Sequence, residues 1–170
     1  MVPEAELSRL YDAHAGALFG YLLNLTRSEA DTRDLLQELF CRLARRPELT
    51  AGVRDERAFL LCMAHNAAVD HARRRDARQR RNDTLAAAAV GLFAPAGDPD
   101  EAAFRRELEA ALAELPVEQR AVVHLKLWEG LTFDAIADAL DIPLNTAASR
   151  YRYGLDKLRT RLRPLYDEIR

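Results

Sequence analysis

The stretch LTFDAIADALDIPLNTAASRYRYGLDKL, residues 131–158, decides the fold, because it reads as two helices joined by a tight turn. Apolar residues at helical spacing give its first half one face to bury, and the hydroxyl of Thr132 is placed to cap that helix. Asp141 ends the apolar run, and Pro143 has the fixed φ that suits the first turn of a new helix. A helix, a turn and a second helix form the helix-turn-helix pattern, which places the second helix in the major groove of DNA.

The second of these helices has an apolar stripe and a polar outer face. The outer face carries Asn145, Ser149, Arg152, Tyr153 and Asp156. Asn, Ser and Arg side chains at a helix start can bond base edges or phosphates, whereas a merely solvated face more often carries Glu and Lys. The residue types therefore favour DNA binding over an ordinary helical hairpin. The stripe, in steps of three and four, consists of Leu144, Ala147, Tyr151, Leu155, Leu158 and Leu162.

Composition indicates an all-α protein with two basic segments. Of 170 residues, 49% are hydrophobic, which is enough to build the core of one medium domain or two small ones. Ala, Leu, Arg and Glu dominate, as in helical proteins. The net charge is only −2, yet residues 57–81 carry seven Arg against two Asp, and residues 145–163 carry six cations against one acid. Two basic segments in an otherwise acidic chain predict defined contacts with a polyanion and a separate surface for another partner.

Several classes of function are excluded by what the residues lack. Cys41 and Cys62 form no CxxC or Cys/His cluster, so we expect reduced thiols and no metal. We find no paired carboxylates, Cys/His dyad or glycine-rich phosphate loop, and so expect neither an enzyme nor a cofactor. No apolar run approaches the roughly 20 residues that span a bilayer, and no signal peptide is visible. These features predict a cytoplasmic protein without membrane insertion.

Upstream of the helix-turn-helix, the pattern predicts five helices in two domains. The first domain, residues 1–81, ends in a segment with six Arg from Arg73 to Arg81, more than a helix dipole needs, which predicts phosphate binding. Residues 82–101 contain four acids and no basic residue, and their part APAGDPD (94–100) should not hold a helix, so we expect a flexible acidic linker. The second domain is 102–170, with Pro164 disrupting its last helix. The second of the five helices is capped by Ser28 and ends before the loop 47–55. The other four are expected at 1–26, 56–81, 102–113 and 117–128.

In their order and spacing, four stretches resemble the sigma factors of the extracytoplasmic-function (ECF) group, the smallest members of the sigma-70 family. The resemblance covers nearly the whole chain outside the linker. It implies two helical domains, called region 2 and region 4, in a factor that gives RNA polymerase its promoter specificity. The stretches are DTRDLLQELFCRLAR (31–45), AFLLCMAHNAAVDHARRR (58–75), LAELPVEQRAVVHLKLWEGLTFDAIADALDIP (112–143) and NTAASRYRYGLDKLR (145–159).

The resemblance also implies roles for individual positions. The loop 47–55 matches the segment that captures a flipped base of the −10 element, and the linker matches the one that threads toward the RNA path of the polymerase. Partners implied are core RNA polymerase (the β′ clamp and the β subunit), promoter DNA and an anti-sigma factor. The positions that match polymerase contacts are Asp34, Gln37 and Glu38. Those that match −10 contacts are Asn66, Arg73, Arg74, Arg75 and Arg78. Those that match −35 contacts are Asn145, Thr146, Ser149, Arg152 and, for a phosphate, Arg150.

The chain departs from the family pattern at six positions, which leaves two other readings open. One is a dimeric helix-turn-helix regulator without polymerase contacts, which would leave Gln37, Glu38 and the Arg-rich helix unexplained. The other is an adaptor that binds a partner but has lost promoter reading. The departures are Phe59 for a Trp, Cys62 and His65 for basic residues, Ala135 for a capping-box Glu, Asp141 for a turn Gly and Ala148 for a Lys.

Overall fold

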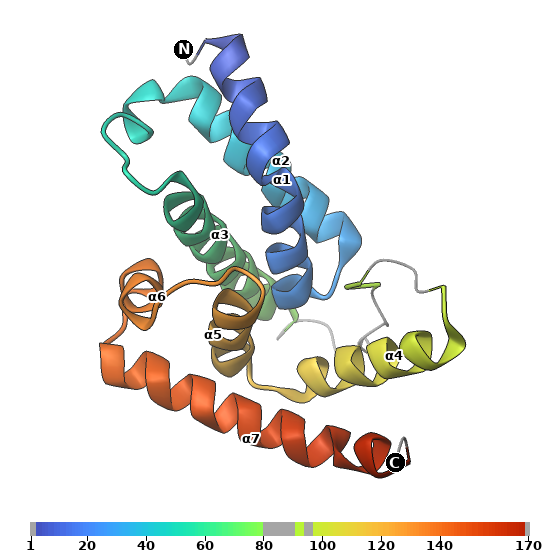
Figure 1. Ribbon diagram of the computed structural model, residues 1–170. Coiled ribbons are helices and arrows are strands. Elements are labelled where there is room, and N and C mark those ends of the chain that lie inside the picture. Colours follow the sequence, from blue (N-terminus) through green and yellow to red (C-terminus); the bar gives the residue numbers. More distant parts are fainter. Residues whose placement is uncertain (1–2, 80–90, 94–96, 169–170) are drawn as a thin grey trace.

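The computed structural model describes residues 3–79, 91–93 and 97–168, without the side chains of residues 78, 79 and 166–168. Over these ranges the chain is helical and contains no strand, so the all-α prediction is confirmed (Figure 1). The elements are α1 (Glu4–Thr26), α2 (Glu29–Arg45), a 3₁₀ turn η1 (Pro47–Leu49), α3 (Glu56–Gln79), α4 (Pro99–Glu114), α5 (Val117–Leu127), α6 (Phe133–Leu140) and α7 (Leu144–Glu168).

The helices begin where short polar side chains can satisfy the free backbone N–H groups of a first turn. Ser28 caps α2 as predicted, because its Oγ accepts from the N–H of Asp31 at 3.2 Å. Asp55 does the same for α3, accepting from the N–H of Ala58 at 2.9 Å. α1 ends at Arg27, whose φ of 56° lies in the left-handed region that stops a helix.

The expectation that residues 94–100 hold no helix is wrong for Pro99 and Asp100. α4 begins at Pro99, inside the expected linker 82–101, because Asp98 caps it and proline suits the first helical position. The Oδ1 atom of Asp98 accepts from the N–H of Asp100 at 3.0 Å. Residues 82–90 and 94–96 lie outside the described residues, so the flexibility of the linker stays a prediction.

Pro164 does not disrupt the last helix, contrary to expectation, since α7 continues through it to Glu168. Proline removes one backbone hydrogen bond there, but apolar residues on both sides hold the helix in place. Leu162 is 7% exposed, and Leu165 packs on the same cluster with Leu112 of α4. Leu144, expected on the apolar stripe, is instead 45% exposed.

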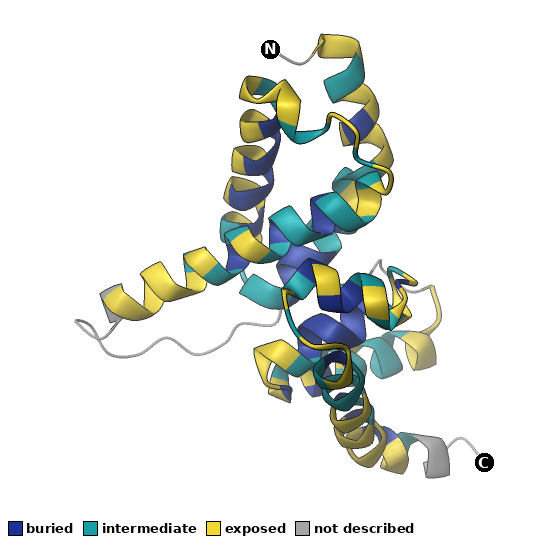
Figure 2. Cartoon of the chain, turned by 90° about the vertical axis from the view of Figure 1, so that its left-hand side faces the viewer, coloured by how far each residue is buried: buried dark blue, intermediate teal, exposed yellow. Residues whose placement is uncertain are grey.

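Two groups of helices, α1–α3 and α4–α7, pack against each other. α5 contacts α1, and α6 contacts α3 (Figure 1). The main hydrophobic cluster crosses this boundary, since it joins Leu22 of α1 and Leu61 of α3 to Val122 of α5 and Ile136 of α6. Figure 2 shows the buried residues running through the middle of both groups. The two groups therefore share one core rather than lying apart.

Candidate polymerase and nucleic-acid interfaces

The turn between α6 and α7 is closed by hydrogen bonds from side chain and backbone. Oγ1 of Thr132 accepts from the N–H of Ala135 at 3.1 Å, which confirms the predicted cap. Asp141 has a φ of 52°, in the left-handed region, and the N–H of Ile142 donates to the carbonyl of Ala137 at 3.0 Å. Glycine takes this conformation most easily, and Asp is one of the few residues that also visit it. Asp141 thus keeps the turn despite replacing the expected glycine, and the predicted helix-turn-helix is confirmed.

α7 approaches α5 closely at Gly154, and Ala147 on the same helix is buried. Ala147 is fully buried, and a Cβ added to Gly154 would lie 2.7 Å from Cγ2 of Val123. This packing fixes the rotation of α7 about its axis and leaves Asn145 and Arg152 exposed. The sequence reasoning missed Gly154. The feature that could have revealed this close approach is a glycine inside a predicted helix. Such a glycine costs about 1 kcal/mol of stability relative to alanine, so its presence indicates close packing.

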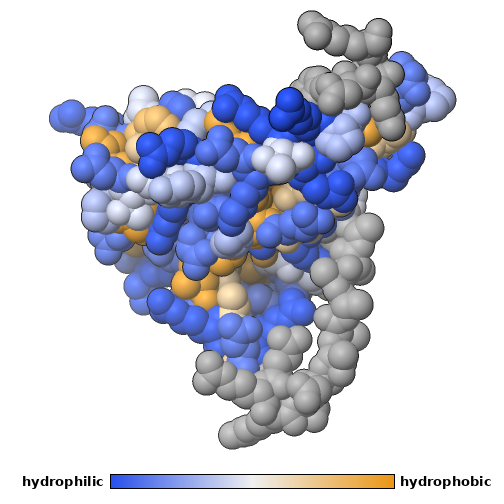
Figure 3. Space-filling model, turned by 90° about the horizontal axis from the view of Figure 1, so that it is seen from below, coloured by the Kyte–Doolittle hydropathy of each residue, from blue (hydrophilic) through white to orange (hydrophobic). Residues whose placement is uncertain are grey.

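The residues expected at the −35 element divide between two sides of α7. Asn145, Ser149 and Arg152 share one side, because a helix turns about 100° per residue. The guanidinium of Arg152 lies 5.1 Å from the ring centre of the exposed Tyr153. Thr146 and Arg150 are half-buried on the neighbouring side. Seen from below, the face along which α7 runs is largely hydrophilic (Figure 3).

The arginine-rich end of α3 extends beyond the packed body (Figure 2). Arg73, Arg74 and Arg75 are all exposed there. Arg73 lies 3.7 Å from Asp70 and Arg75 lies 3.9 Å from Asp31 of α2, both in ion pairs on the surface. Exposed pairs of this kind contribute little and are easily exchanged for phosphates.

The two remaining parts of the predicted −10 surface are Arg78 and Asn66. The side chain of Arg78 lies outside the described residues. Asn66 is exposed near the middle of α3, and its Nδ2 lies 3.7 Å from the sulfur of Cys62. The loop 47–55 contains one short 3₁₀ turn, Pro47–Leu49, and a left-handed Gly52 with a φ of 75°. The loop and Asn66 therefore offer polar groups and backbone at the surface.

Asp34, Gln37 and Glu38, expected at the polymerase, are exposed along one side of α2. The opposite side of α2 is buried against α1 and α3. A groove lies next to this acidic side, and the sequence reasoning missed it. Tyr11 on its wall is 50% exposed and packs edge-on against Phe40 at 5.0 Å between ring centres. The groove is lined by Leu7, Tyr11, Phe19, Gln37, Phe40 and Cys41, among others.

Buried polar groups that the sequence analysis did not predict join α1 and α3 to α5. Nδ2 of Asn24 lies 3.1 Å from Nδ1 of His124, a hydrogen bond across 100 positions of the chain. The Tyr21 hydroxyl lies 2.9 Å from Nδ1 of His65, and the ring of Tyr21 packs on that of His124. At the edge, Arg57 Nη2 lies 2.5 Å from Oε2 of Glu129, whose side chain is only 5% exposed. These six residues are called the seam below.

Burial and neighbouring charge shift the protonation of the groups at and beside the seam. Burial, together with the nearby cation of Arg150, lowers the pKa of His65 to about 4. Burial also raises the pKa of the Tyr21 hydroxyl far above its ordinary value. The pKa of Arg120, which is buried, falls to about 10 through desolvation and the charge of Arg27. At neutral pH the His65–Tyr21 contact is therefore a hydrogen bond between uncharged groups.

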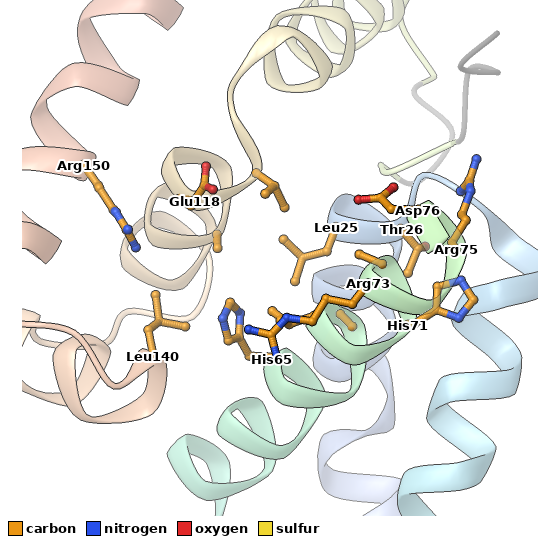
Figure 4. A pocket seen from close by; sticks show the side chains of 15 residues that line it. Leu25, Thr26, His65, His71, Arg73, Arg75, Asp76, Glu118, Leu140 and Arg150 are labelled. Atoms are coloured by element: carbon orange, nitrogen blue, oxygen red, sulfur yellow. The ribbon is translucent and has the colours of Figure 1, made fainter. Parts of the chain in front are cut away.

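A cavity of about 480 Å³ opens beside His65, between α3 and the second group of helices. Its floor is apolar, with Leu25 and Leu140 among the lining residues. Its rim carries Arg73 and Arg75 from α3 and Arg150 from α7. Figure 4 shows Arg150 pointing from α7 into the space above His65 and Leu140. Arg150, expected at a promoter phosphate, thus faces the first group of helices.

The described part of the chain offers no group of three or more His, Cys, Asp or Glu side chains placed to hold a metal ion. Cys41 is exposed and Cys62 half-buried, and neither forms a disulfide. None of the helices described has the length and apolar character that crossing a membrane requires.

Comparison with protein families matches both halves of the chain. Residues 10–78 match sigma-70 region 2, and residues 105–158 match sigma-70 region 4. The helix-turn-helix lies within the second match, and the arginines of α3 lie within the first.

Individual relatives match almost end to end. The chain is 37% identical to the ECF RNA polymerase sigma factor SigL of Mycobacterium tuberculosis, over 95% of this chain and 92% of SigL. It is 34% identical to the RNA polymerase sigma factor CarQ of Myxococcus xanthus, over 94% of this chain and 91% of CarQ. Among solved structures, the sigma factor RpoE of Bartonella quintana, in complex with the anti-sigma factor NepR, shares the fold. The TM-score is 0.75 at 19% identity, covering 94% of this chain and 96% of RpoE.

Proposed function

The chain belongs to the ECF RNA polymerase sigma factors of the sigma-70 family, and from that premise we propose which of its surfaces bind the polymerase and which bind promoter DNA. As a sigma factor it directs transcription initiation and is not itself an enzyme. The exposed side of α2, with Asp34, Gln37 and Glu38, docks on the β′ clamp of core RNA polymerase. α3 and the loop 47–55 bind the −10 element, and α7 binds the −35 element.

The observation that carries this proposal is the separation of one acidic and two basic surfaces on three different helices. The acidic side of α2 offers acceptors to a basic partner, and Glu38 is exposed on it. The exposed arginines of α3 suit DNA phosphates, and Asn66 and the loop lie where an unstacked base could be held. Asn145, Ser149 and Arg152 follow a closed helix-turn-helix and suit base edges in the major groove.

An anti-sigma factor is the fourth expected partner. RpoE, which shares the fold, was solved in complex with the anti-sigma factor NepR. We infer that this chain also binds an anti-sigma factor, which holds it inactive in the cytoplasm until a signal arrives.

Transcription in vitro tests the proposal directly. Purified core polymerase with this chain should start at discrete sites on genomic fragments, and the sites should share two sequence elements. Glu38→Lys should abolish core binding, since it opposes a basic partner with a cation, while circular dichroism stays unchanged. Unchanged affinity for core would refute the docking surface on α2. Core binding without any start sites would favour the adaptor reading.

A further inference from the structure

The interior of the cavity beside His65 has no part in the contacts proposed above for polymerase and promoter. The cavity is lined by residues of α1, α3, α5, α6 and α7, so it lies where the two groups of helices meet (Figure 4). Its volume of about 480 Å³ lies within the range of about 300–1,000 Å³ of pockets that hold small molecules, and such pockets are frequent at boundaries between domains. The size and position of the cavity therefore suit a small ligand.

The floor of the cavity is apolar and only partly covered. Leu25 of α1, Val69 of α3 and Leu140 of α6 are half-buried there. Val117, the first residue of α5, is 45% exposed. Covering apolar side chains of this kind is favourable in proportion to the area that is removed from water. The floor thus suits the apolar body of a ligand.

The rim of the cavity has a cation without a counter-charge, Arg150 of α7. Arg150 is half-buried, and none of the acids in the described part of the chain forms an ion pair with it. By contrast, Arg73 at the same rim lies 3.7 Å from Asp70. Arg75 lies 3.9 Å from Asp31. A half-buried cation is more stable beside an anion, so Arg150 favours a ligand with a negative charge.

The charges around the cavity balance a single negative group. Its lining has three arginines against two acids, Asp76 and Glu118, which is a net charge of +1 when the histidines are counted as uncharged. For His65 this holds at neutral pH, because burial, together with the cation of Arg150, lowers its pKa to about 4. Figure 4 shows Arg73 and Arg150 reaching from α3 and α7 toward the space beside His65. Guanidinium groups bind carboxylates through paired N–H donors.

We propose that the cavity binds a small amphipathic anion, a molecule with an apolar body of rings or chain carbons and one singly charged head such as a carboxylate. The body covers Leu25, Val117 and Leu140 on the floor. The head lies between Arg150 and Arg73, where it supplies the counter-charge that Arg150 lacks. This site goes beyond the proposed function and does not depend on it, because it belongs to the free protein without polymerase or DNA.

Isothermal titration calorimetry of the full-length free protein with naphthalene-2-carboxylate tests the site. Naphthalene-2-carboxamide is the matched control compound, since it has the same rings and nearly the same shape but no charge. The carboxylate should bind once per chain and about tenfold more tightly than the carboxamide, because only its charge pairs with Arg150. Decanoate should compete with it, and the tighter of the two anions shows whether rings or a chain form the preferred body. Inorganic phosphate, which has charge but no apolar body, should bind far more weakly than either.

Two pairs of variants separate the head from the body. Arg150→Gln should weaken carboxylate binding about tenfold and leave carboxamide binding unchanged. Arg159→Gln is its matched control, because Arg159 is exposed on the same helix about two and a half turns further on, and so on the opposite side. Ala72→Trp places a large side chain at an exposed position of the lining and should abolish binding of both compounds. Ala30→Trp, exposed on α2 away from the cavity, should leave both unchanged.

Three outcomes would overturn the proposal. In the first, neither naphthalene-2-carboxylate nor decanoate binds. In the second, the carboxamide or inorganic phosphate binds as tightly as the carboxylate, so that charge or apolar body is irrelevant. In the third, Arg150→Gln and Arg159→Gln bind the carboxylate equally. Start sites that depend on core polymerase are measured separately, so a failure of the cavity site and a failure of the proposed function are distinguishable.

Discussion

α3 and α7 are both basic helices that we propose bind DNA, but they differ in how they pack against the rest of the protein. α7 lies close on α5 at Gly154, Ala147 is buried, and the exposed residues of α7 follow directly after the turn of the helix-turn-helix. α3 is packed in its first half, and Arg73–Arg75 lie on its exposed end. A helix fixed in rotation can align side chains with base edges, whereas cations on a projecting end suit phosphates of any sequence. The two helices should therefore respond differently to substitution.

Lowering the pH should have the largest effect, and it tests whether α3 is independent of α7. The pKa of His65 in α3 is about 4, well below its ordinary value of 6.5. The groups facing it are Tyr21 of α1, Arg73 of α3, Glu118 of α5 and Arg150 of α7. Between pH 6.5 and 4 the unfolded chain binds a proton that the folded chain does not, so the free energy of unfolding should fall by about 2–3 kcal/mol.

Urea unfolding at several pH values measures this loss in the free energy of unfolding. His65→Gln has no titrating group at this position and should lose less stability than the wild type as the pH falls from 6.5 to 4. An identical pH dependence of the two proteins would contradict the pKa assigned to His65.

Arg152→Ala tests the sequence reading assigned to α7. If Arg152 contacts a base edge, its loss should weaken binding to the −35 element by about 1–3 kcal/mol and relax the preference at one base pair. Binding to promoter variants, measured with the polymerase holoenzyme, checks this. A promoter substituted at that base pair should then lose nothing further in the variant, whereas additive losses would argue against the contact.

Gly154→Ala and Gly16→Ala form a matched pair that tests the close packing of α7. The added methyl group at Gly154 would press on Val123 in a filled core, which typically costs 1–3 kcal/mol and exceeds the helix-propensity gain of about 1 kcal/mol. At Gly16 the same methyl group meets nothing within 4 Å, so only the gain remains. Thermal unfolding should show Gly154→Ala less stable and Gly16→Ala more stable than the wild type. Equal shifts in the same direction would refute the close approach.

Arg74→Ala should have the smallest effect, and one that is the same for all sequences. Arg74 is exposed at the projecting end of α3, where a phosphate contact adds about one unit to the salt dependence of binding. Titrations at several salt concentrations should show the slope reduced by about 1, with promoter preference unchanged. A changed preference would mean that α3 reads sequence from its end as well.

Local features of this fold could be predicted from the sequence because their causes lie within a few residues. Ser28 and Thr132 cap their helices as expected, because each hydroxyl accepts a hydrogen bond from a backbone N–H in the first turn of the helix that follows it. The helix-turn-helix followed from the apolar spacing together with the Thr132 cap and Pro143 at the start of the second helix. The effect of Pro164 was predicted wrongly because packing on α4 outweighs the usual effect of a proline inside a helix. The start of α4 was predicted wrongly because Pro99 suits the first position of a helix that Asp98 caps.

The seam could not be predicted because its partners lie far apart in the chain. In the sequence, Asn24 is a polar residue near the end of the predicted helix 1–26, and His124 is a polar residue within the predicted helix 117–128. Only packing of α5 on α1 makes them a buried pair. Likewise Arg150 could not be separated from Arg152 by residue type. Its different direction depends on the rotation of α7 that Gly154 permits.

The hydrogen bond between Asn24 and His124 has a consequence for synthesis of the protein. The two residues are 100 positions apart. At about 5–20 residues per second, the ribosome makes His124 roughly 5–20 s after Asn24. During that time the side of α1 that will receive α5 has no partner. The N-terminal helices must therefore fold first and wait with an apolar surface open, which makes this side of α1 a place where a chaperone could bind the nascent chain.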